Sequence, residues 1–222
     1  MASPVRIACS FLSEADRYEA IDLLTEAFCL NDPIEIALRI TPDEFRKMIE
    51  PELDAVLHNN LSLVAREVGS GRMVGVLLAA DALSESVDSC SAASRKFDPI
   101  SEIARNLSNF YLNNRDVLPG ACLYLFVVGV HPEATGNGFG KMLIGRVLQN
   151  ARQRGFQSAY ALATNLGSMC ILERHGFHGI KEVDYQTYRY QGRAVFASIT
   201  EHPGIVLMEN DNLADFCAGQ PA

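Results

Sequence analysis

The feature that most constrains this sequence is an apolar strand, a glycine-rich loop and a helix in direct succession. Residues Leu123–Val130 read LYLFVVGV, which has the length and composition of a buried β-strand. The strand ends at His131-Pro132, and Gly136-Asn137-Gly138-Phe139-Gly140 follows with three glycines. Apolar residues then recur at helical spacing, at Leu143, Ile144, Val147, Leu148 and Ala151. The pattern predicts a loop between the end of a strand and the first turn of a helix.

Such a loop is suited to bind an anion. A helix leaves its first backbone N–H groups without partners and directs the positive end of its dipole there. Glycines let the backbone approach a ligand closely, so successive N–H groups can surround phosphate oxygens. Residues 131–155 also carry a net charge of +3, within a chain whose net charge is −8. The segment predicts a pyrophosphate site, although basic residues on one helix also form an ordinary solvated face.

The spacing of the glycines distinguishes this loop from two well-known phosphate loops. A dinucleotide fold needs G-x-G-x-x-G with an acidic residue about 20 residues later, and a nucleotide hydrolase needs G-x-x-x-x-G-K-[ST]. Here the spacing is G-x-G-x-G, and Lys141 is followed by Met142, which has no hydroxyl for a magnesium ion. Taken alone, the loop is equally compatible with a glycine-rich turn that binds nothing.

Two linked motifs resemble the GNAT superfamily of acetyl-CoA-dependent N-acyltransferases. The family pattern is a strand ending V-x-P and then [QR]-x-x-G-x-[GA]; the chain has Val130-His131-Pro132 and then Thr135 to Gly140, with Thr135 as a departure. The second family motif is N-x-x-[AS]-x-x-[LI]-Y-E-[KR]-x-G-F, after a further strand. The chain matches it from Asn165 to Phe177, except that Leu172 replaces the tyrosine.

The resemblance implies an α/β (α+β) fold in one domain over residues 1–222. We expect a mixed, mostly antiparallel sheet of six or seven strands, flanked by helices and splayed at its central strands to admit acetyl-CoA. Near the C-terminus, alternation predicts a hairpin of Ile180–Tyr190 with Ala194–Ile199, followed by a strand at Gly204–Met208. Ser84–Ser94 has the composition of a loop, and residues 210–222 are expected to be a partly frayed tail.

The resemblance also implies where acetyl-CoA binds. It would enter between the strand at Val128 and the strand at Ser158, and its pantetheine would pair with the backbone of the first strand. We expect the cofactor to be lined by Val128, Gly129, Val130, Thr135, Gly136, Asn137, Gly138, Phe139, Gly140, Lys141, Asn165 and Ser168. The two valines are equally compatible with simple core positions, since their backbone would bind.

Catalytic roles are assigned through the same resemblance. An amine must lose a proton before it attacks a thioester, so a base is needed. Phe28–Ile34 resembles the F-x-x-[DE]-[DE]-P-[LI] segment of insect-type arylalkylamine acetyltransferases, which gives Asp32 the role of base, although Asp-Pro is also an ordinary turn. In most relatives a tyrosine at position 172 protonates the leaving thiolate. Ser168 is the candidate to replace it, with close helix packing as the alternative role.

The expected acceptor is a small primary amine. Helices before the central strand are rich in apolar residues and could form the wall of an apolar acceptor pocket, or simply pack in the core: Ile34, Ile36, Leu38, Phe45 and Phe110. We therefore expect apolar amines to be preferred over aminoglycosides. A protein or peptide N-acetyltransferase and a non-catalytic acyl-CoA-binding module are the alternatives.

Composition limits the remaining classes. The six cysteines and five histidines are scattered without a metal-binding pattern, so no metal is predicted. The net negative charge argues against nucleic acid as a partner. No apolar run is long enough to span a membrane and no signal peptide is recognisable at the N-terminus, so we expect a cytoplasmic protein without a membrane partner, as a monomer or homodimer.

Overall fold

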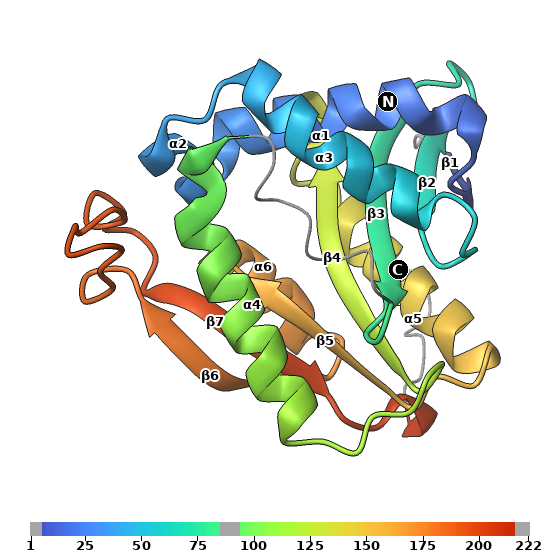
Figure 1. The fold of residues 1–222 in the computed structure, drawn as a ribbon. Coiled ribbons are helices and arrows are strands. Elements are labelled where there is room, and N and C mark those ends of the chain that lie inside the picture. The colour runs from blue at the N-terminus through green and yellow to red at the C-terminus, as the bar shows by residue number, and fades with distance from the viewer. Residues whose placement is uncertain (1–5, 85–93, 216–222) are drawn as a thin grey trace.

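A seven-stranded mixed sheet forms the centre of the protein (Figure 1). The computed structural model describes residues 6–84 and 94–215. The strands lie in the order β1-β2-β3-β4-β5-β7-β6, and every neighbouring pair is antiparallel except β4 and β5, which are parallel. Their bounds are β1 Ile7–Phe11, β2 Leu63–Glu67, β3 Met73–Asp81, β4 Cys122–Val130, β5 Ser158–Ala163, β6 His178–Asp184 and β7 Gly204–Asn210. This confirms the expected fold class.

Helices cover both faces of the sheet (Figure 1). Their bounds are α1 Arg17–Asn31, α2 Pro33–Leu38, α3 Pro42–Val56, α4 Asp98–Asn113, α5 Phe139–Gln153 and α6 Leu166–Glu173. Residues of α5 and α6 pack with one face of β2 to β5. On the other face, α1 and α3 pack over β2 and β3, and α4 packs over β5 and β7. Because β3 is covered on both faces, its first eight residues are all buried.

The sheet is open between its two central strands. β4 and β5 pair only from Cys122–Leu125 to Ser158–Ala161. Beyond Leu125, β4 continues to Val130 with β3 as its partner, and residues 126–128 are only half buried. The expected splay at the central strands is therefore confirmed.

The predicted hairpin of Ile180–Tyr190 with Ala194–Ile199 is wrong. β6 ends at Asp184, whose carboxylate accepts the N–H groups of Gln186 (2.7 Å) and Thr187 (2.8 Å), and β6 pairs with β7 instead. Residues 185–203 form turns, in which the fully buried rings of Tyr185 and Phe196 pack edge to face at 5.5 Å. The apolar residues of this segment thus reflect a loop that packs onto the core rather than a strand.

The two segments expected to be irregular differ in how much of them is described. Most of the Ser84–Ser94 loop, residues 85–93, lies outside the described residues. The frayed tail does not begin at Asn210, because Asn210 belongs to β7 and buried Leu213 donates its N–H to the Gln157 carbonyl at 2.8 Å. Residues 216–222 lie outside the described part of the chain. Among the described helices, none combines the length and apolarity needed to cross a membrane.

Candidate active site

A cavity of about 150 Å³ lies where β4 and β5 separate. Sequence positions far apart meet there, from the α1–α2 junction, the second half of β4, the start of α5 and the start of α6. Its lining is Phe28, Asp32, Leu77, Leu125, Phe126, Val127, Val128, Gly140, Ile144, Ala161, Leu162, Thr164, Asn165, Ser168, Ile171 and Leu172. The cavity thus includes five predicted site residues, namely Asp32, Val128, Gly140, Asn165 and Ser168.

The backbone of β4 presents hydrogen-bonding groups to this opening. The His131 N–H donates to the Val74 carbonyl at 3.0 Å, so the backbone groups of His131 are directed toward β3. In an antiparallel pair every second residue has this orientation, so the backbone groups of Gly129 are directed toward β3 as well. The alternation of a strand then turns the N–H and C=O groups of Val128 and Val130 away from β3, toward the side where β5 has separated. These two residues offer an edge to which an extended ligand can hydrogen-bond.

Gly129 also has a packing role, which the sequence did not predict. Its backbone pairs with β3, and a Cβ at this position would lie 2.7 Å from Leu24 Cδ2 and 3.2 Å from Leu23 Cδ2 of α1. A glycine is needed here because α1 packs directly against β4. Gly129 therefore lets α1 approach the strand, and its hydrogen-bonding groups do not face the opening.

The glycine loop has the geometry of an anion site. Gly136 and Gly138 have φ values of 84° and 78°, a region that residues with a Cβ rarely adopt. Gly138 precedes α5, and its carbonyl accepts the first helical hydrogen bond, from the Met142 N–H at 3.0 Å. The N–H groups of residues 139–141 therefore have no acceptor within the helix. The Asn137 amide donates to the Ala134 carbonyl at 3.1 Å and so holds the loop, while Thr135 and Lys141 are exposed.

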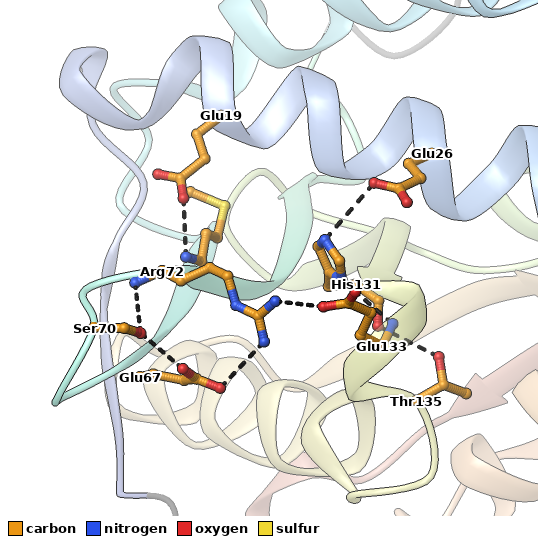
Figure 2. A network of polar contacts seen from close by, with 9 residues as sticks. Glu19, Glu26, Glu67, Ser70, Arg72, His131, Glu133 and Thr135 are labelled. Carbon is orange, nitrogen blue, oxygen red and sulfur yellow. Dashed lines mark hydrogen bonds and ion pairs between the residues drawn. The ribbon is translucent and has the colours of Figure 1, made fainter.

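A polar network holds the segment that leads into this loop (Figure 2). Arg72 of the β2–β3 turn contacts Glu133 at 2.7 Å and Glu67 at 3.4 Å. This guanidinium holds the pKa of Glu133 below its usual value. On the other side of the segment, Glu26 of α1 lies 3.7 Å from His131. Each exposed pair contributes little to stability, but together the pairs join two other elements to residues 131–133.

Asp32 connects the α1–α2 junction to the end of β5. Its Oδ1 accepts the Ile34 N–H at 2.9 Å and so caps α2, and its Oδ2 accepts the Thr164 hydroxyl at 2.8 Å. The Asn165 amide lies 3.4 Å from the same Thr164 oxygen. Asp32 is 7% exposed and lines the cavity. Thr164 was missed from the sequence, where its one signal is that it directly precedes the Asn165 motif.

Ser168 both caps α6 and faces the cavity. Its N–H donates to Asn165 Oδ1 at 2.9 Å, and its hydroxyl donates to the Asn165 carbonyl at 2.8 Å while accepting the Asn165 N–H at 3.3 Å. Asn165 and Ser168 thus form a reciprocal capping box. Ser168 thus helps to fix the start of α6, a role that was not predicted from the sequence.

The five apolar residues that could have formed a pocket wall or packed in the core do not line the cavity. Ile34 and Phe45 are core residues at 1% exposure, as the packing alternative has it, and Ile36 points outward at 54% exposure. Helical periodicity could not reveal which apolar residue faces which neighbour. The wall is instead Phe28, Phe126, Leu162, Ile171 and Leu172. Leu172 occupies the expected tyrosine position as a 4% exposed apolar residue.

Within residues 6–84 and 94–215, no group of three or more His, Cys, Asp or Glu side chains is arranged to hold a metal ion.

The family model for the acetyltransferase (GNAT) family matches residues 34–177. The chain belongs to this family. The GNAT family uses acetyl-CoA as a co-substrate, and the unpaired N–H groups at the start of α5 and the free edge of β4 fit such a ligand.

Three solved structures illustrate the proteins that share this fold. The C-terminal condensation domain of Ebony, in complex with β-alanyl-dopamine, is 16% identical over 93% of this chain and 99% of that one, with a TM-score of 0.84. The arylalkylamine N-acetyltransferase 2 from Aedes aegypti is 21% identical over 93% and 99%, with a TM-score of 0.78. The Drosophila melanogaster polyamine N-acetyltransferase, which forms N-acetylagmatine, is 18% identical over 93% and 100%, with a TM-score of 0.72. At these identities the likeness establishes the fold of the GNAT protein.

The glycine loop yields a prediction about binding. Gly138→Ala forces a side chain into a positive φ at the start of α5, and Gly192→Ala does the same at φ 78° in a remote turn, with open space around both residues. Both variants should lose about 1–2 kcal/mol of stability. Only Gly138→Ala should weaken CoA binding, by at least about tenfold, because it alone displaces N–H donors from the loop. Isothermal titration with CoA measures this, and equal affinities of the two variants would contradict the assignment of the loop.

Proposed function

We propose that this GNAT protein transfers an acetyl group from acetyl-CoA directly to the amino group of a small primary amine. The observation that carries the proposal is that one cavity contains both Asp32 and the β4 residue Val128, beside the start of α5. A thioester held along β4 and an amine held by Asp32 would therefore meet within the same cavity. The interior of the cavity is mostly apolar, which strengthens electrostatic interactions with the reacting groups.

Residues of β4 and α5 would hold the acetyl donor. The backbone groups of Val128 and Val130 would pair with pantetheine as a neighbouring strand would, and the N–H groups of residues 139–141 would bind the pyrophosphate. We assign Thr135, Gly136, Asn137, Gly138, Phe139, Gly140 and Lys141 to this phosphate end, and Asn165 and Ser168 to the thiol end. Acetyl-CoA supplies the activated acetyl group and accepts the electron pair of the broken C–S bond.

Asp32 would bind and deprotonate the acceptor. A primary amine has a pKa near 10 and arrives as an ammonium ion, which the buried carboxylate attracts and from which it accepts a proton. The neutral nitrogen then attacks the acetyl carbonyl, the new C–N bond forms, and the C–S bond breaks. The backbone N–H of Val128 is the donor that would stabilise the oxyanion of the intermediate. The bonds from Ile34 and Thr164 keep the Asp32 carboxylate aimed at this region.

The leaving thiolate needs a proton. Leu172 cannot provide one, so we assign this step to Ser168, whose side chain borders the cavity from the first turn of α6. The hydroxyl would give its proton to the thiolate and recover one from solvent. To do so, the hydroxyl would turn from the Asn165 carbonyl, a neutral acceptor, to the thiolate. Thr164 stays with Asp32 in this scheme, because its hydroxyl donates to a carboxylate, which is a stronger acceptor.

The cavity wall supports an acceptor with an apolar body. Aromatic and aliphatic side chains line the cavity together with Asp32, among them Phe28, Phe126 and Leu162. Among the solved structures with this fold are an arylalkylamine N-acetyltransferase, a condensation domain in complex with β-alanyl-dopamine, and an enzyme that forms N-acetylagmatine. We therefore favour a small cationic amine over an aminoglycoside or a peptide N-terminus.

A panel of acceptors tests the proposed function. Thiol release from acetyl-CoA should be fastest with an arylalkylamine such as tyramine, measurable with agmatine, and at least about tenfold lower in kcat/KM with an aminoglycoside or a short peptide. The reason is that burying about 100 Å² of apolar surface is worth about 2.5 kcal/mol, whereas a polyhydroxylated acceptor loses hydrogen bonds to water. Turnover of the peptide or the aminoglycoside at an equal or higher rate would contradict the small apolar acceptor.

The role of Ser168 is tested by comparing the stability and the kcat of Ser168→Ala with those of Thr41→Ala. Ser168→Ala and Thr41→Ala each remove a hydroxyl from a capping box, at the N3 position of α6 and at the N-cap of the remote α3. Thr41→Ala should cost about 1 kcal/mol of stability, and Ser168→Ala no more than that, because Asn165 remains as the N-cap of α6. Only Ser168→Ala should lower kcat, by at least about tenfold, because it also removes a proton donor. A kcat equal to that of Thr41→Ala would leave Ser168 with the capping role alone.

A further inference from the structure

A second carboxyl group lies directly behind Asp32. Glu35, in the first turn of α2, is 8% exposed and does not line the cavity, so the proposed reaction has no use for it. Its Oε2 atom is buried without a hydrogen-bond partner among the described residues. A buried, ionised carboxylate with an oxygen that accepts no hydrogen bond is strongly destabilised by desolvation, so the burial of the Glu35 carboxyl requires an explanation.

Glu35 is the third residue after the N-cap of α2, but it cannot complete a capping box there. In a capping box, the glutamate three residues after the N-cap accepts the backbone N–H of the N-cap residue. Here the N–H of Asp32 already donates to the Phe28 carbonyl at 2.9 Å, at the end of α1. The donor that does reach the Glu35 carboxyl is its own backbone N–H. The direct passage from α1 into α2 thus leaves this carboxyl without the donor it would normally have.

Within the described residues, the titratable groups that act most strongly on the Glu35 carboxyl are Asp32 and Cys29 of α1, and Tyr185 after β6 also lies near it. All three are acidic groups. The Tyr185 hydroxyl donates to the Thr164 carbonyl at 2.7 Å. Burial, and next the negative charge of Asp32, raise the pKa of Glu35 well above its usual value. Both carboxyl groups are buried, at 7% and 8% exposure and three residues apart at the start of α2, an arrangement that favours one shared proton over two negative charges.

The hydrogen bonds around the pair indicate which carboxyl holds that proton. The two groups are within hydrogen-bonding reach of each other, which is favourable only if one of them is protonated. Asp32 receives the Ile34 N–H and the Thr164 hydroxyl, and both donors favour a charged carboxylate. Glu35 is enclosed away from solvent by α1 and the segment after β6. The proton therefore belongs on Glu35.

We propose that Glu35 is a positioning residue that holds the shared proton of the Asp32–Glu35 pair and donates it to Asp32, so that Asp32 carries the single negative charge facing the acceptor. The proposal rests on the proposed function, in which Asp32 binds the amine. A third donor to Asp32 restricts the orientation of its carboxylate. When Glu35 ionises at higher pH, that donor is lost and a repelling charge appears behind Asp32.

Two substitutions at position 35 separate this role from simple packing. Glu35→Gln keeps the shape and a permanent N–H donor but cannot titrate, whereas Glu35→Leu keeps similar bulk without a donor. We expect kcat/KM of Glu35→Gln at neutral pH within about threefold of the unaltered protein, with the alkaline titration of Glu35 missing from its pH profile. Glu35→Leu should lose at least about tenfold, the size of effect seen when a supporting hydrogen bond is removed. Equal activities of Glu35→Leu and the unaltered protein would overturn the inference.

A spectroscopic measurement decides the proton's location without relying on catalysis. The infrared C=O band of a protonated carboxyl should be present at neutral pH and absent in Glu35→Gln. Glu44→Gln is the control, because Lys96 and then the Thr41 N–H lower the pKa of Glu44 to about 2 and keep it ionised. Persistence of the band in Glu35→Gln would overturn the inference. A normal rate for Asp32→Asn would instead refute the role of Asp32 in the proposed function, and the infrared result would still locate the proton.

Discussion

The separation of β4 from β5 after Leu125 is the feature on which the rest of the site depends. Within a sheet, each strand normally satisfies its backbone groups on both edges, and an unpaired edge is open to any extended partner. Here β4 pairs with β3 from Leu123 to Val130, apart from a register shift at Phe126, while its other edge loses β5 after four paired residues. The unpaired edge points into the cavity, next to the N-terminus of α5. An extended ligand with a phosphate at one end could hydrogen-bond to the edge of β4 and place its phosphate at the N-terminus of α5.

Packing on the far side of β4 makes this open edge possible. α1 lies so close to the strand that only a glycine fits at position 129, and Leu23 and Leu24 contact it there. The same helix ends at Asn31, where Asp32-Pro33 starts α2 in a new direction and turns the Asp32 carboxylate toward Thr164. The bond between Asp32 and Thr164 spans the opening. The helix α1 therefore both packs against β4 and, at its C-terminal end, places Asp32 at the cavity.

The sequence predicted best the parts of this arrangement that are encoded locally. The strand, the positive-φ glycines and the start of α5 lie within 20 consecutive residues, and the Asn165–Ser168 capping box spans four. The parts that were missed depend on contacts between distant segments. Thr164 matters because Asp32 reaches it from 132 residues away, and Ala194–Ile199 looked like a strand because Phe196 is buried by tertiary packing. Burial of Glu35 likewise follows from the α1–α2 geometry, which no local pattern encodes.

The most direct test of the account is amide hydrogen exchange along β4, with and without CoA. The Val128 and Val130 N–H groups point to the opening, whereas the Gly129 N–H is already directed toward β3. Binding of CoA along the free edge should slow exchange at Val128 and Val130 by at least about tenfold and leave Gly129 nearly unchanged. Saturating CoA that protects neither valine amide would contradict the central claim that the opened edge of β4 is the binding site.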